Sequence, residues 1–502
     1  TKWEEYSDFQ ICSDSKLQAE VIFMGGGNAT IVYQNRETAV GATKKLSHEI
    51  LKKTGGTLKF AVAYLDTECK NYLNDRDELI NELKINKYRM IHQAPLLGIG
   101  ITRKGNTDGL PATKAGDDKN EYISKSARIK RDIFKYNKYF DHMLPNTVDY
   151  DFPLEFDDLG QKKGENYIAV VHIDGNNMGQ KLGSLLKFDR SAEYQKSIQI
   201  IRSFSKEVDV KYRSAMRRVV LKLADGLKTD AFYKRLDPVV KNQKLILPIR
   251  PIVRSGDDVT FVCNGKIGIA LAEAFLMQLY KDPGIHINGS VIEFSACAGV
   301  AIVKSHFPFY RAYHLAKELC KSAKMKGKIL AKQNGVEDIA NWLDFHIVQT
   351  GITTNLKEIR DRFYQVPGME GPDGLIYEEY GDVQMKLGRY NLLWRPWCIA
   401  GNCDEKYEWD RFRDIYTAFT KKKKDEVLWK RSRLKKLESE MSKSESDVQA
   451  YVRECKSRGF RLPECSGNSH LYRDEQTPYF DALELLDFYV QLPEAEEVSH
   501  EN

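Results

Sequence analysis

Three aspartates carry the clearest chemical signal in the sequence. Asp174 follows an almost unbroken apolar run in YIAVVHIDGNNMG (167–179), and Asp257 and Asp258 stand together in SGDDVTFVC (255–263). Carboxylates are ligands that hard cations such as Mg²⁺ and Mn²⁺ prefer. Two such cations, about 3.5–4 Å apart, can align a hydroxyl with a triphosphate and stabilise the leaving pyrophosphate. The aspartates therefore predict a two-metal nucleotidyl-transfer site that takes ATP or another nucleoside triphosphate.

Small and amide residues beside the aspartates would complete a triphosphate site. Glycine lets backbone approach phosphate closely, and free backbone N–H groups can cradle it. An Asp-Asp pair in a turn is ordinary by itself, because aspartate is a common turn former. The aspartate at the end of an upstream strand is what makes the pair a candidate site. We expect nucleotide contacts from the flanking residues Gly175, Asn176, Asn177, Gly179, Ser255 and Gly256.

The elements that must position these residues can be read from hydrophobic patterning. A buried strand precedes Asp174, and a tight hairpin surrounds Gly256. The remaining expected elements are one or two helices over 191–236, a helix over 267–280, a strand over 292–303 and an amphipathic helix over 309–328. The order β–α–β–β–α–β–α is that of a ferredoxin-like palm domain.

The same pattern occurs earlier in the chain in a shorter form. GGGNATIVY (25–33) aligns without gaps on SGDDVTFVC, so that Gly27 and Asn28 stand where the second copy has its two aspartates. A helix over 37–53 and a strand over 58–66 follow in the same order as in the second copy. Three elements in one order indicate two related domains, of which the first lacks the acidic pair.

The motifs resemble those of a known family. IDGNNMG followed by SGDD is similar to the second palm of the large polymerase/cyclase subunit of type III CRISPR effector complexes, which has a DGDNMG-like turn and a GGDD hairpin. Diguanylate cyclases with GGDEF hairpins are more distant relatives. The resemblance implies that Asp174 and Asp257 bind metal and that Asp258 binds metal or positions substrate. It also implies metal binding by the Ile173 carbonyl and γ-phosphate binding by Lys324, for which a solvated lysine at a helix end is the alternative.

This sequence departs from the family pattern at several points. Asn176 and Asn177 replace the acidic residue often found in the turn, and Ser255 replaces the first hairpin glycine. A His-Asp dipeptide in a helical N-terminal domain is not seen, and residues 100–165 contain no cysteine for the family's usual zinc-binding insert. These departures predict a compact or stand-alone relative without the HD nuclease domain.

The resulting fold prediction is an α+β protein with two ferredoxin-like, nucleotide cyclase/GGDEF-like palm domains and a helical C-terminal domain. Its expected ranges are 1–110 for the degenerate first palm, 111–165 for a helical linker or insert, 166–335 for the catalytic palm and 336–502 for the helical domain.

Composition bears on the partners of the protein and on its location in the cell. A net charge of +6 from 77 basic and 71 acidic residues permits a nucleic-acid partner without arguing for one. No apolar run reaches the ~20 residues of a membrane helix, and the first residues show no secretory signal, so we expect a cytoplasmic protein without membrane contact. The basic stretch 421–436 is either a solvated helix face or a track for a nucleic-acid backbone.

The nine cysteines do not form the pattern of a disulfide framework. Zinc binding by Cys398, Cys403, Cys455 and Cys465 stays open, since their spacing lacks a tight C-x2-C knuckle.

Two functions from different classes fit these observations. The first is a metal-dependent nucleotidyltransferase that converts ATP, or another nucleoside triphosphate, into a cyclic or linear oligonucleotide messenger in CRISPR-type antiviral defence. The second is a non-catalytic palm-fold scaffold or RNA-binding subunit, because a fold alone does not guarantee activity. A template-directed polymerase ranks lower. Base preference, linkage and cyclisation stay open, and RNA, CRISPR-like protein subunits and a second copy of the chain (a homodimer) are the candidate partners.

Overall fold

The computed structural model describes residues 9–11, 16–90, 99–116, 120–135, 138–159, 166–187, 194–287, 289–349, 355–368, 379–380, 383–384, 388–420, 422–423, 426–427, 429–463, 471–472 and 476–493. The chain divides into two compact units. The first comprises Thr1–Phe140, Gly179–Glu207 and His286–Ser290, and the second comprises Asp141–Met178, Val208–Ile285 and Val291–Asn502. These units combine parts of the four predicted ranges, whose boundaries stay predictions.

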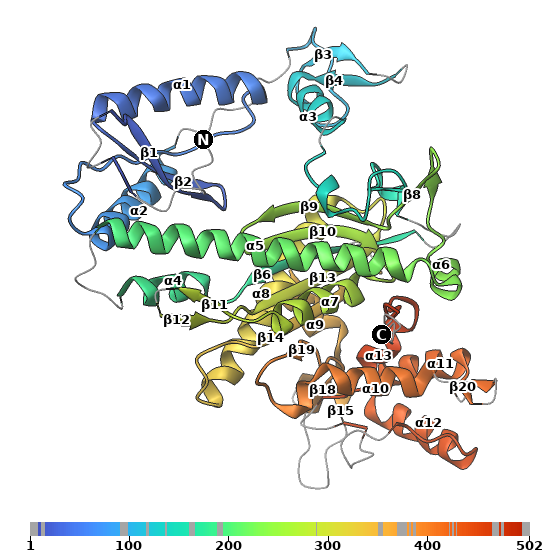
Figure 1. The fold of residues 1–502 in the computed structure, drawn as a ribbon. Helices are drawn as coiled ribbons and strands as arrows, with labels where there is room; N and C mark the ends of the chain where they lie inside the picture. The colour runs from blue at the N-terminus through green and yellow to red at the C-terminus, as the bar shows by residue number, and fades with distance from the viewer. Residues whose placement is uncertain are drawn as a thin grey trace, which may run out of the picture. The chain divides into compact units, whose positions relative to one another are not determined.

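A six-stranded sheet forms the centre of the second unit, with strand order β19-β14-β13-β6-β10-β9 (Figure 1). Its strands are β6 (Tyr167–Gly175), β9 (Ile249–Ser255), β10 (Asp258–Asn264), β13 (Ala296–Lys304), β14 (Asn341–Ile347) and β19 (Trp397–Ala400). The four strands β13-β6-β10-β9 pair only in antiparallel fashion. Numbered along the chain, their spatial order is 4-1-3-2, as a ferredoxin-like palm requires. The predicted palm is thus present.

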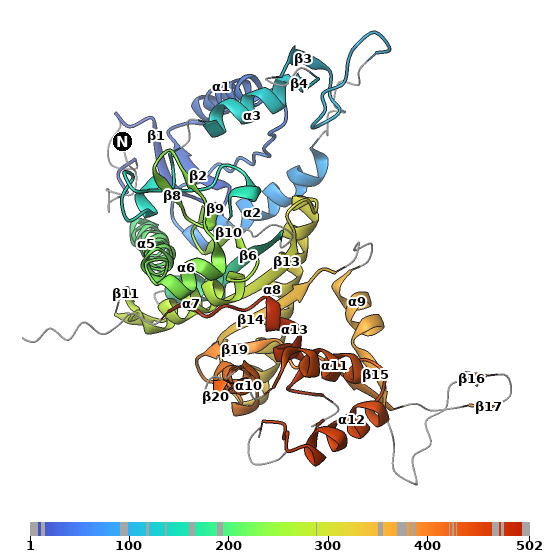
Figure 2. The same cartoon turned by 90° about the vertical axis from the view of Figure 1, so that its right-hand side faces the viewer.

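Helices cover both faces of this sheet, which explains why β6 is apolar along its whole length. The helices α5 (Tyr194–Gly226, of which the part from Val208 belongs to this unit) and α7 (Gly268–Lys281) lie on one face, and α8 (Phe309–Gln333) lies on the other (Figure 2). Because side chains alternate along a strand, Val170 and Val262 pack toward α8. Ala169 instead lies on the α7 side, where a Cβ on Gly268 would come within 2.3 Å of it.

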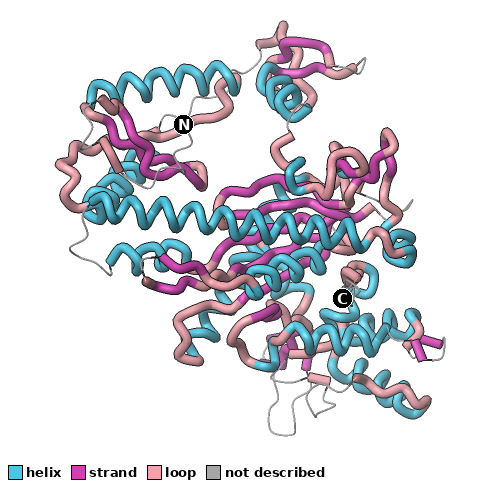
Figure 3. The backbone as a smooth tube through the Cα atoms, viewed as in Figure 1, coloured by secondary structure: helices cyan, strands magenta, loops and turns pink. Residues whose placement is uncertain are grey.

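The segment after residue 336 begins with strands, which corrects the expectation that the pattern is helical from that point. Strand β14 pairs in parallel with β13, and β19 pairs with β14, so both extend the palm sheet. All seven residues of β14, NWLDFHI, are buried. A short run buried on both sides has no period that separates a strand from a helix. Helices and strands therefore alternate here before the chain becomes mainly helical (Figure 3).

The first unit contains the other hairpin, β1 (Ala19–Gly25) with β2 (Asn28–Tyr33), followed by α1 (Arg36–Thr54). Gly26 and Gly27 form its two-residue turn with φ values of 57° and 75°, a left-handed conformation that glycine adopts more readily than other residues. The strand predicted over 58–66 is wrong, because these residues join no sheet. The hairpin forms a two-stranded sheet without a third strand beside it, and an apolar, β-branched run becomes a strand only where a neighbour accepts its hydrogen bonds.

The remaining elements are short or peripheral, and the following list gives their bounds. The strands are β3 (Ala112–Ala115), β4 (Tyr122–Ser124), β5 (Tyr150–Asp151), β7 (Val240–Lys241), β8 (Lys244–Ile246), β11 (Ile285–Ile287), β12 (Ser290–Ile292), β15 (Gln365–Gly368), β16 (Glu379–Tyr380), β17 (Val383–Gln384), β18 (Gly388–Asn391), β20 (Lys422–Lys423) and β21 (Glu426–Val427); the helices are α2 (Tyr72–Arg89), α3 (Lys125–Lys135), α4 (Met178–Lys187), α6 (Asp230–Leu236), α9 (Leu356–Phe363), α10 (Trp409–Thr420), α11 (Arg431–Met441), α12 (Glu445–Ser457) and α13 (Phe480–Glu484). Among the described helices, none has the length and apolar character needed to cross a membrane.

Candidate active site

Two of the three aspartates face each other across neighbouring strands. Asp174 on β6 and Asp258 on β10 are direct partners in the antiparallel ladder. Directly opposite side chains in such a ladder project from the same face, with Cβ atoms about 4.5–5.5 Å apart. Since Val170 and Val262 are partners in the same register and pack toward α8, both carboxylates lie on the α8 face.

Asp257 comes from the tight turn that joins β9 to β10. Ser255 pairs with Asp258, which leaves Gly256 and Asp257 as the two turn residues. Gly256 has a φ of 61°, the conformation that a type II′ hairpin turn requires at its first position. Asp257 lies beside Gly175, because a Cβ built on that glycine would be 2.8 Å from the Asp257 Cβ. The hairpin thus brings a third carboxyl to the edge at which β6 ends.

The three carboxyl groups affect one another electrostatically. Burial, followed by the negative charge of Asp174, raises the pKa of Asp257 to about 6. The same two causes, in the same order, raise the pKa of Asp258. Like charges held together at a half-buried edge disfavour full ionisation. Such a cluster gains from a bound cation.

Lys324 on α8 supplies a cation from within the chain. Its Nζ donates a hydrogen bond to Oδ2 of Asp174 and a second, of 2.7 Å, to the carbonyl oxygen of Gly175. The lysine side chain is 20% exposed and the Asp174 side chain 41% exposed. The lysine predicted to contact phosphate therefore lies at the carboxylates, paired with one of them.

The amide side chain of Asn176 anchors the turn after β6. Asn176 is 1% exposed, and its Nδ2 donates to the Ala340 carbonyl and to Ser295 Oγ, both at 3.1 Å. A carboxylate at this position could not donate, which gives a physical reason for asparagine here. Asn177 follows with a φ of 56°, a left-handed conformation that asparagine tolerates.

His172 belongs to the same face and was not predicted as a site residue. It is 4% exposed, and its Nδ1 lies 3.0 Å from Thr260 Oγ1 and 3.5 Å from Asp258 Oδ1. Burial is the main cause that lowers the pKa of His172, to about 4, so the ring is neutral at pH 7. The sequence contains a signal that could have identified His172. It is the polar residue that interrupts the apolar run, and it stands two residues before Asp174, so both side chains lie on the same face of the strand.

The donor set fits a hard divalent cation. Oδ1 of Asp258 is buried and has no hydrogen-bond partner among the described residues. A metal ion would satisfy this oxygen together with the carboxylates of Asp174 and Asp257. Within the part of the chain that the structure describes, however, no group of three or more His, Cys, Asp or Glu side chains is already gathered as a metal site. Lys324 instead pairs with Oδ2 of Asp174, so its ammonium group would compete with a cation for that oxygen.

The other predicted contact residues occupy less specific positions. Ile173 lies inside the ladder, opposite Val259 and Ala298, so metal binding by its carbonyl stays a prediction. Gly179 is the second residue of α4 and belongs to the first compact unit. Nucleotide contacts by it and by Ser255 likewise stay predictions.

The four cysteines considered for zinc are not brought together as thiols. Cys398 and Cys403 pair as a disulfide, so they are not available as thiolate ligands. Cys455 is a buried free thiol, and Cys465 lies outside the described residues.

The basic stretch 421–436 forms the short hairpin β20–β21 and the start of α11. On the helix, Arg431 pairs with Asp487, and Lys435 with Glu438 at 2.7 Å. These pairs compensate part of the charge at the start of α11, and nucleic-acid binding by the stretch stays open.

Comparison with known proteins agrees with the palm assignment. Residues 167–331 match the family described as Cas10/Cmr2, second palm domain. No curated protein matches the chain.

Similar solved structures include the Csm1–Csm4 cassette in complex with pppApApA (13% identity, TM-score 0.46, covering 93% of this chain and 62% of that one) and in complex with cA4 (13%, 0.45, 93% and 61%). Csm1 in T. onnurineus is also similar (14%, 0.39, 94% and 62%). The chain thus spans about three fifths of the length of these proteins.

Proposed function

We propose that this palm of the Cas10/Cmr2 second-palm type is a metal-dependent nucleotidyltransferase that joins ATP, or another nucleoside triphosphate, into a cyclic or linear oligonucleotide. The observation that carries the proposal is the cross-strand pair Asp174–Asp258, with Asp257 in the adjoining turn. Holding three carboxyl groups at one edge raises the pKa of Asp257, through burial and the Asp174 charge, and so costs stability. A ligand of opposite charge offsets that cost.

In the proposed reaction, a ribose hydroxyl of one nucleotide attacks the α-phosphorus of another. The new bond joins the ribose oxygen to phosphorus, the bond from the α-phosphorus to the bridging oxygen breaks, and pyrophosphate leaves while the hydroxyl proton passes to solvent. When bound, two Mg²⁺ or Mn²⁺ ions would supply alignment and charge neutralisation. The chain's own part is to hold Asp174, Asp257 and Asp258 in place beside the triphosphate.

Two neighbouring residues suit this task. The ammonium group of Lys324, now on Asp174, is close enough to exchange that carboxylate for a phosphate oxygen. Gly175 has no space for a side chain, since a Cβ there would lie 2.7 Å from Tyr212 Oη. The absence of a side chain at Gly175 lets Asp257 lie close to the end of β6.

The test is incubation with radiolabelled ATP and Mg²⁺ or Mn²⁺, with separation of pyrophosphate and oligonucleotides by chromatography. We expect products from the wild type and a loss of at least a hundredfold in rate for Asp257→Asn/Asp258→Asn. Asp230→Asn is the matched control, because the Asp230 side chain is 95% exposed and should leave the rate unchanged. Turnover that survives the double substitution would exclude the assignment.

A second candidate, a non-catalytic palm that serves as a scaffold or RNA-binding subunit, is favoured by one observation. Lys324 already neutralises Asp174, which gives the acidic edge an internal partner without any metal. Metal-dependent ATP binding without pyrophosphate release, under conditions in which the chain is folded, would support this candidate.

The biological setting that we propose is supported by the family match alone. We place the activity in CRISPR-type antiviral defence, with CRISPR-like protein subunits or RNA as partners, because residues 167–331 match a Cas10/Cmr2 domain. Copurification of the chain with such subunits from its host tests this placement.

A further inference from the structure

Helix α8 is strongly basic for a helix that packs on a sheet. Its sequence, FYRAYHLAKELCKSAKMKGKILAKQ, contains seven Lys or Arg residues and one acidic residue, Glu318. The Glu318 carboxylate accepts a hydrogen bond from the backbone N–H of Leu356, which begins α9, and lies 3.8 Å from Nδ1 of His314. Among the described residues, no ion pair joins Glu318 to a lysine of this helix.

Four of these lysines lie on one line. Lys317, Lys321, Lys328 and Lys332 are all exposed and, together with Lys324, follow the spacing i, i+4, i+7, i+11, i+15. At about 100° per residue, these positions fall within roughly 80° of the helix circumference, and they extend over about 22 Å. We call the four exposed residues the α8 lysine stripe. The opposite side of the helix, with Ala316, Leu319 and Ala323 among others, is buried against the sheet.

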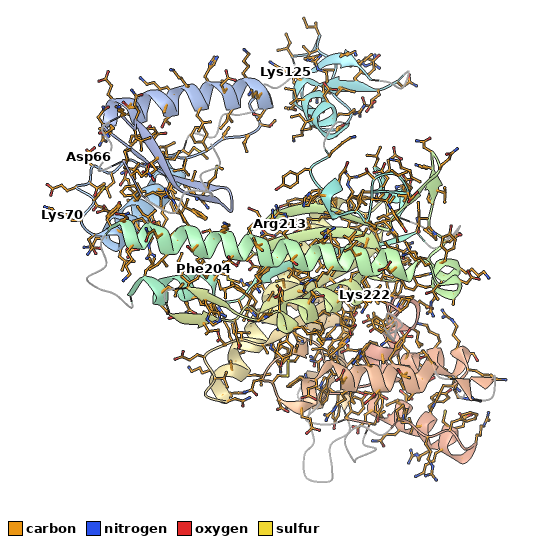
Figure 4. The ribbon with its side chains drawn as sticks, in the orientation of Figure 1. Asp66, Lys70, Lys125, Phe204, Arg213 and Lys222 are labelled. Atoms are coloured by element: carbon orange, nitrogen blue, oxygen red, sulfur yellow. A yellow bond between two sulfur atoms is a disulfide. The ribbon has the colours of Figure 1, made fainter. Side chains whose placement is uncertain are left out.

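The stripe is not neutralised by ion pairs within the described part of the chain. None of its four lysines forms an ion pair with a described residue, although Lys317 lies 5.4 Å from the centre of the Tyr313 ring. Other helices differ in this respect: on α5, Lys211 pairs with Asp282 at 2.8 Å, and Arg213, which is visible in Figure 4, pairs with Asp209. Uncompensated like charges in a row repel one another, so the stripe is a surface that a polyanion would stabilise.

The stripe is continuous with the candidate active site. Lys324, in the same line, donates to Asp174 and to the Gly175 carbonyl. Lys317 is near enough to Asp258 for its charge to lower the pKa of that carboxyl, against the larger effect of burial, which raises it. A chain of phosphates that starts at the aspartates would therefore meet lysines along α8 in both directions.

From this continuity we infer that the α8 lysine stripe binds the phosphodiester backbone of a single-stranded oligonucleotide, namely the growing product of the adjacent site. Its length corresponds to about six nucleotides of a stacked strand at about 3.4 Å each. The identity of the strand as product rests on the proposed function, whereas the recognition of a phosphodiester chain rests on the lysines alone. Holding the product would retain short intermediates for further rounds of addition.

The test uses the full chain and the variant Lys321→Gln/Lys328→Gln/Lys332→Gln, which leaves Lys317 and Lys324 intact. The probes are 5′-triphosphorylated tetra-adenylate and a 20-nucleotide RNA of mixed sequence, each labelled with fluorescein at the 3′ end and followed by anisotropy over a range of salt concentrations. The matched control is Lys44→Gln/Lys45→Gln/Lys52→Gln, which removes three exposed lysines of α1 in the other compact unit.

We expect the stripe variant to bind tetra-adenylate about tenfold more weakly at low salt. Its slope of log K against log salt should fall by about 2, because each phosphate of a single strand that a lysine no longer neutralises lowers the slope by about 0.7. The control should match the wild type, and the stripe variant should release shorter products from ATP than the wild type does. Unchanged affinity and slope for both probes would overturn the inference.

The two proposals fail in different ways. Suppose that neither the wild type nor the variants release pyrophosphate from ATP, while the stripe variant loses affinity for both probes. The proposed catalysis then fails, and the stripe remains an RNA-binding surface. If the wild type makes oligonucleotides while the stripe variant keeps full affinity and product length, only the present inference fails.

Discussion

Asp174 and Asp258 are direct partners in the ladder between β6 and β10, and Lys324 from α8 already holds one of them. The ammonium group offsets part of the negative charge of this edge, and carboxylate oxygens remain for a ligand. Oδ1 of Asp258, which is buried without a hydrogen-bond partner among the described residues, is the least satisfied of these oxygens. Substitutions at and around the edge should therefore change stability and ligand binding in ways that can be measured separately.

Removing the Asp257 charge should stabilise the protein above pH 6. Burial and the Asp174 charge raise the pKa of Asp257 from 3.8 to about 6, so the folded state binds this proton more tightly than the unfolded state does. The group's favourable contribution to stability is therefore complete below about pH 4 and is lost as the pH rises through 6. In EDTA, we expect Asp257→Asn to have the wild-type Tm at pH 4 and a Tm roughly 2–4 °C higher at pH 7.5. A difference in Tm that does not vary with pH would contradict this, and Asp230→Asn should show no difference at either pH.

Replacing Lys324 should separate metal binding from nucleotide binding. The ammonium group competes with a cation for Asp174, so Lys324→Met should bind Mn²⁺ about tenfold more tightly when nucleotide is absent. The same variant should bind ATP more weakly, because it has lost a charge that can pair with phosphate. Electron paramagnetic resonance of free Mn²⁺ measures the first quantity and equilibrium dialysis the second. Lys44→Met, on α1 and exposed, is the control; weaker Mn²⁺ binding by Lys324→Met would show that the lysine supports the cation rather than competing with it.

A methyl group should be tolerated at one glycine of the DGNNMG turn and not at the other. A Cβ on Gly175 would lie 2.6–2.8 Å from Met178 Cε, Tyr212 Oη and the Asp257 Cβ, whereas a Cβ on Gly179 would meet nothing within 4 Å. Gly175→Ala should therefore lower the free energy of unfolding by about 1–3 kcal/mol and displace Asp257. Gly179→Ala should raise it by up to about 1 kcal/mol, since alanine favours helix. Urea denaturation of both variants checks this, and equal effects would count against it.

Introducing an acid at position 176 should destabilise the protein. Asn176 Nδ2 donates to the Ala340 and Ile339 carbonyls, and an aspartate would place a buried charge against the same oxygens. We expect Asn176→Ala to cost about 1–3 kcal/mol of unfolding free energy and Asn176→Asp to cost more at pH 7. The cost of Asn176→Asp should shrink at pH 4, where the carboxyl can protonate and donate. Chemical denaturation at both pH values decides the matter; an Asn176→Asp variant as stable as the wild type at pH 7 would refute this interpretation.

The palm could be predicted from sequence because its signals are local and redundant. The run before Asp174, the Gly256 turn and the periodicity over 267–280 each indicate one element, and the strands pair in the only order that the ferredoxin-like fold allows. Asp174 and Asp258 could be predicted to meet for the same reason, since two strand ends fix them.

Other features depend on partners that no local pattern reveals. The segment 58–66 has the composition of a strand and joins no sheet, while the buried segment Asn341–Ile347 does become a strand because β13 offers it an edge. The Lys324–Asp174 contact likewise depends on how α8 lies over the sheet, which periodicity does not give. His172 is the exception, because simple alternation from Asp174 already places it on the active face.

The parallel pairing of β13 with β14 has a practical consequence for dissecting the molecule. The matched family domain ends shortly before Gly335. A fragment that ends at Gly335 would lack β14, so the edge of β13 that pairs with β14 would expose unpaired backbone N–H and C=O groups. Such an edge invites other chains to add to it, so the isolated palm should precipitate or self-associate. It would also lose the Ala340 carbonyl that receives the Asn176 amide. The palm is therefore best studied with the strand that follows it still attached.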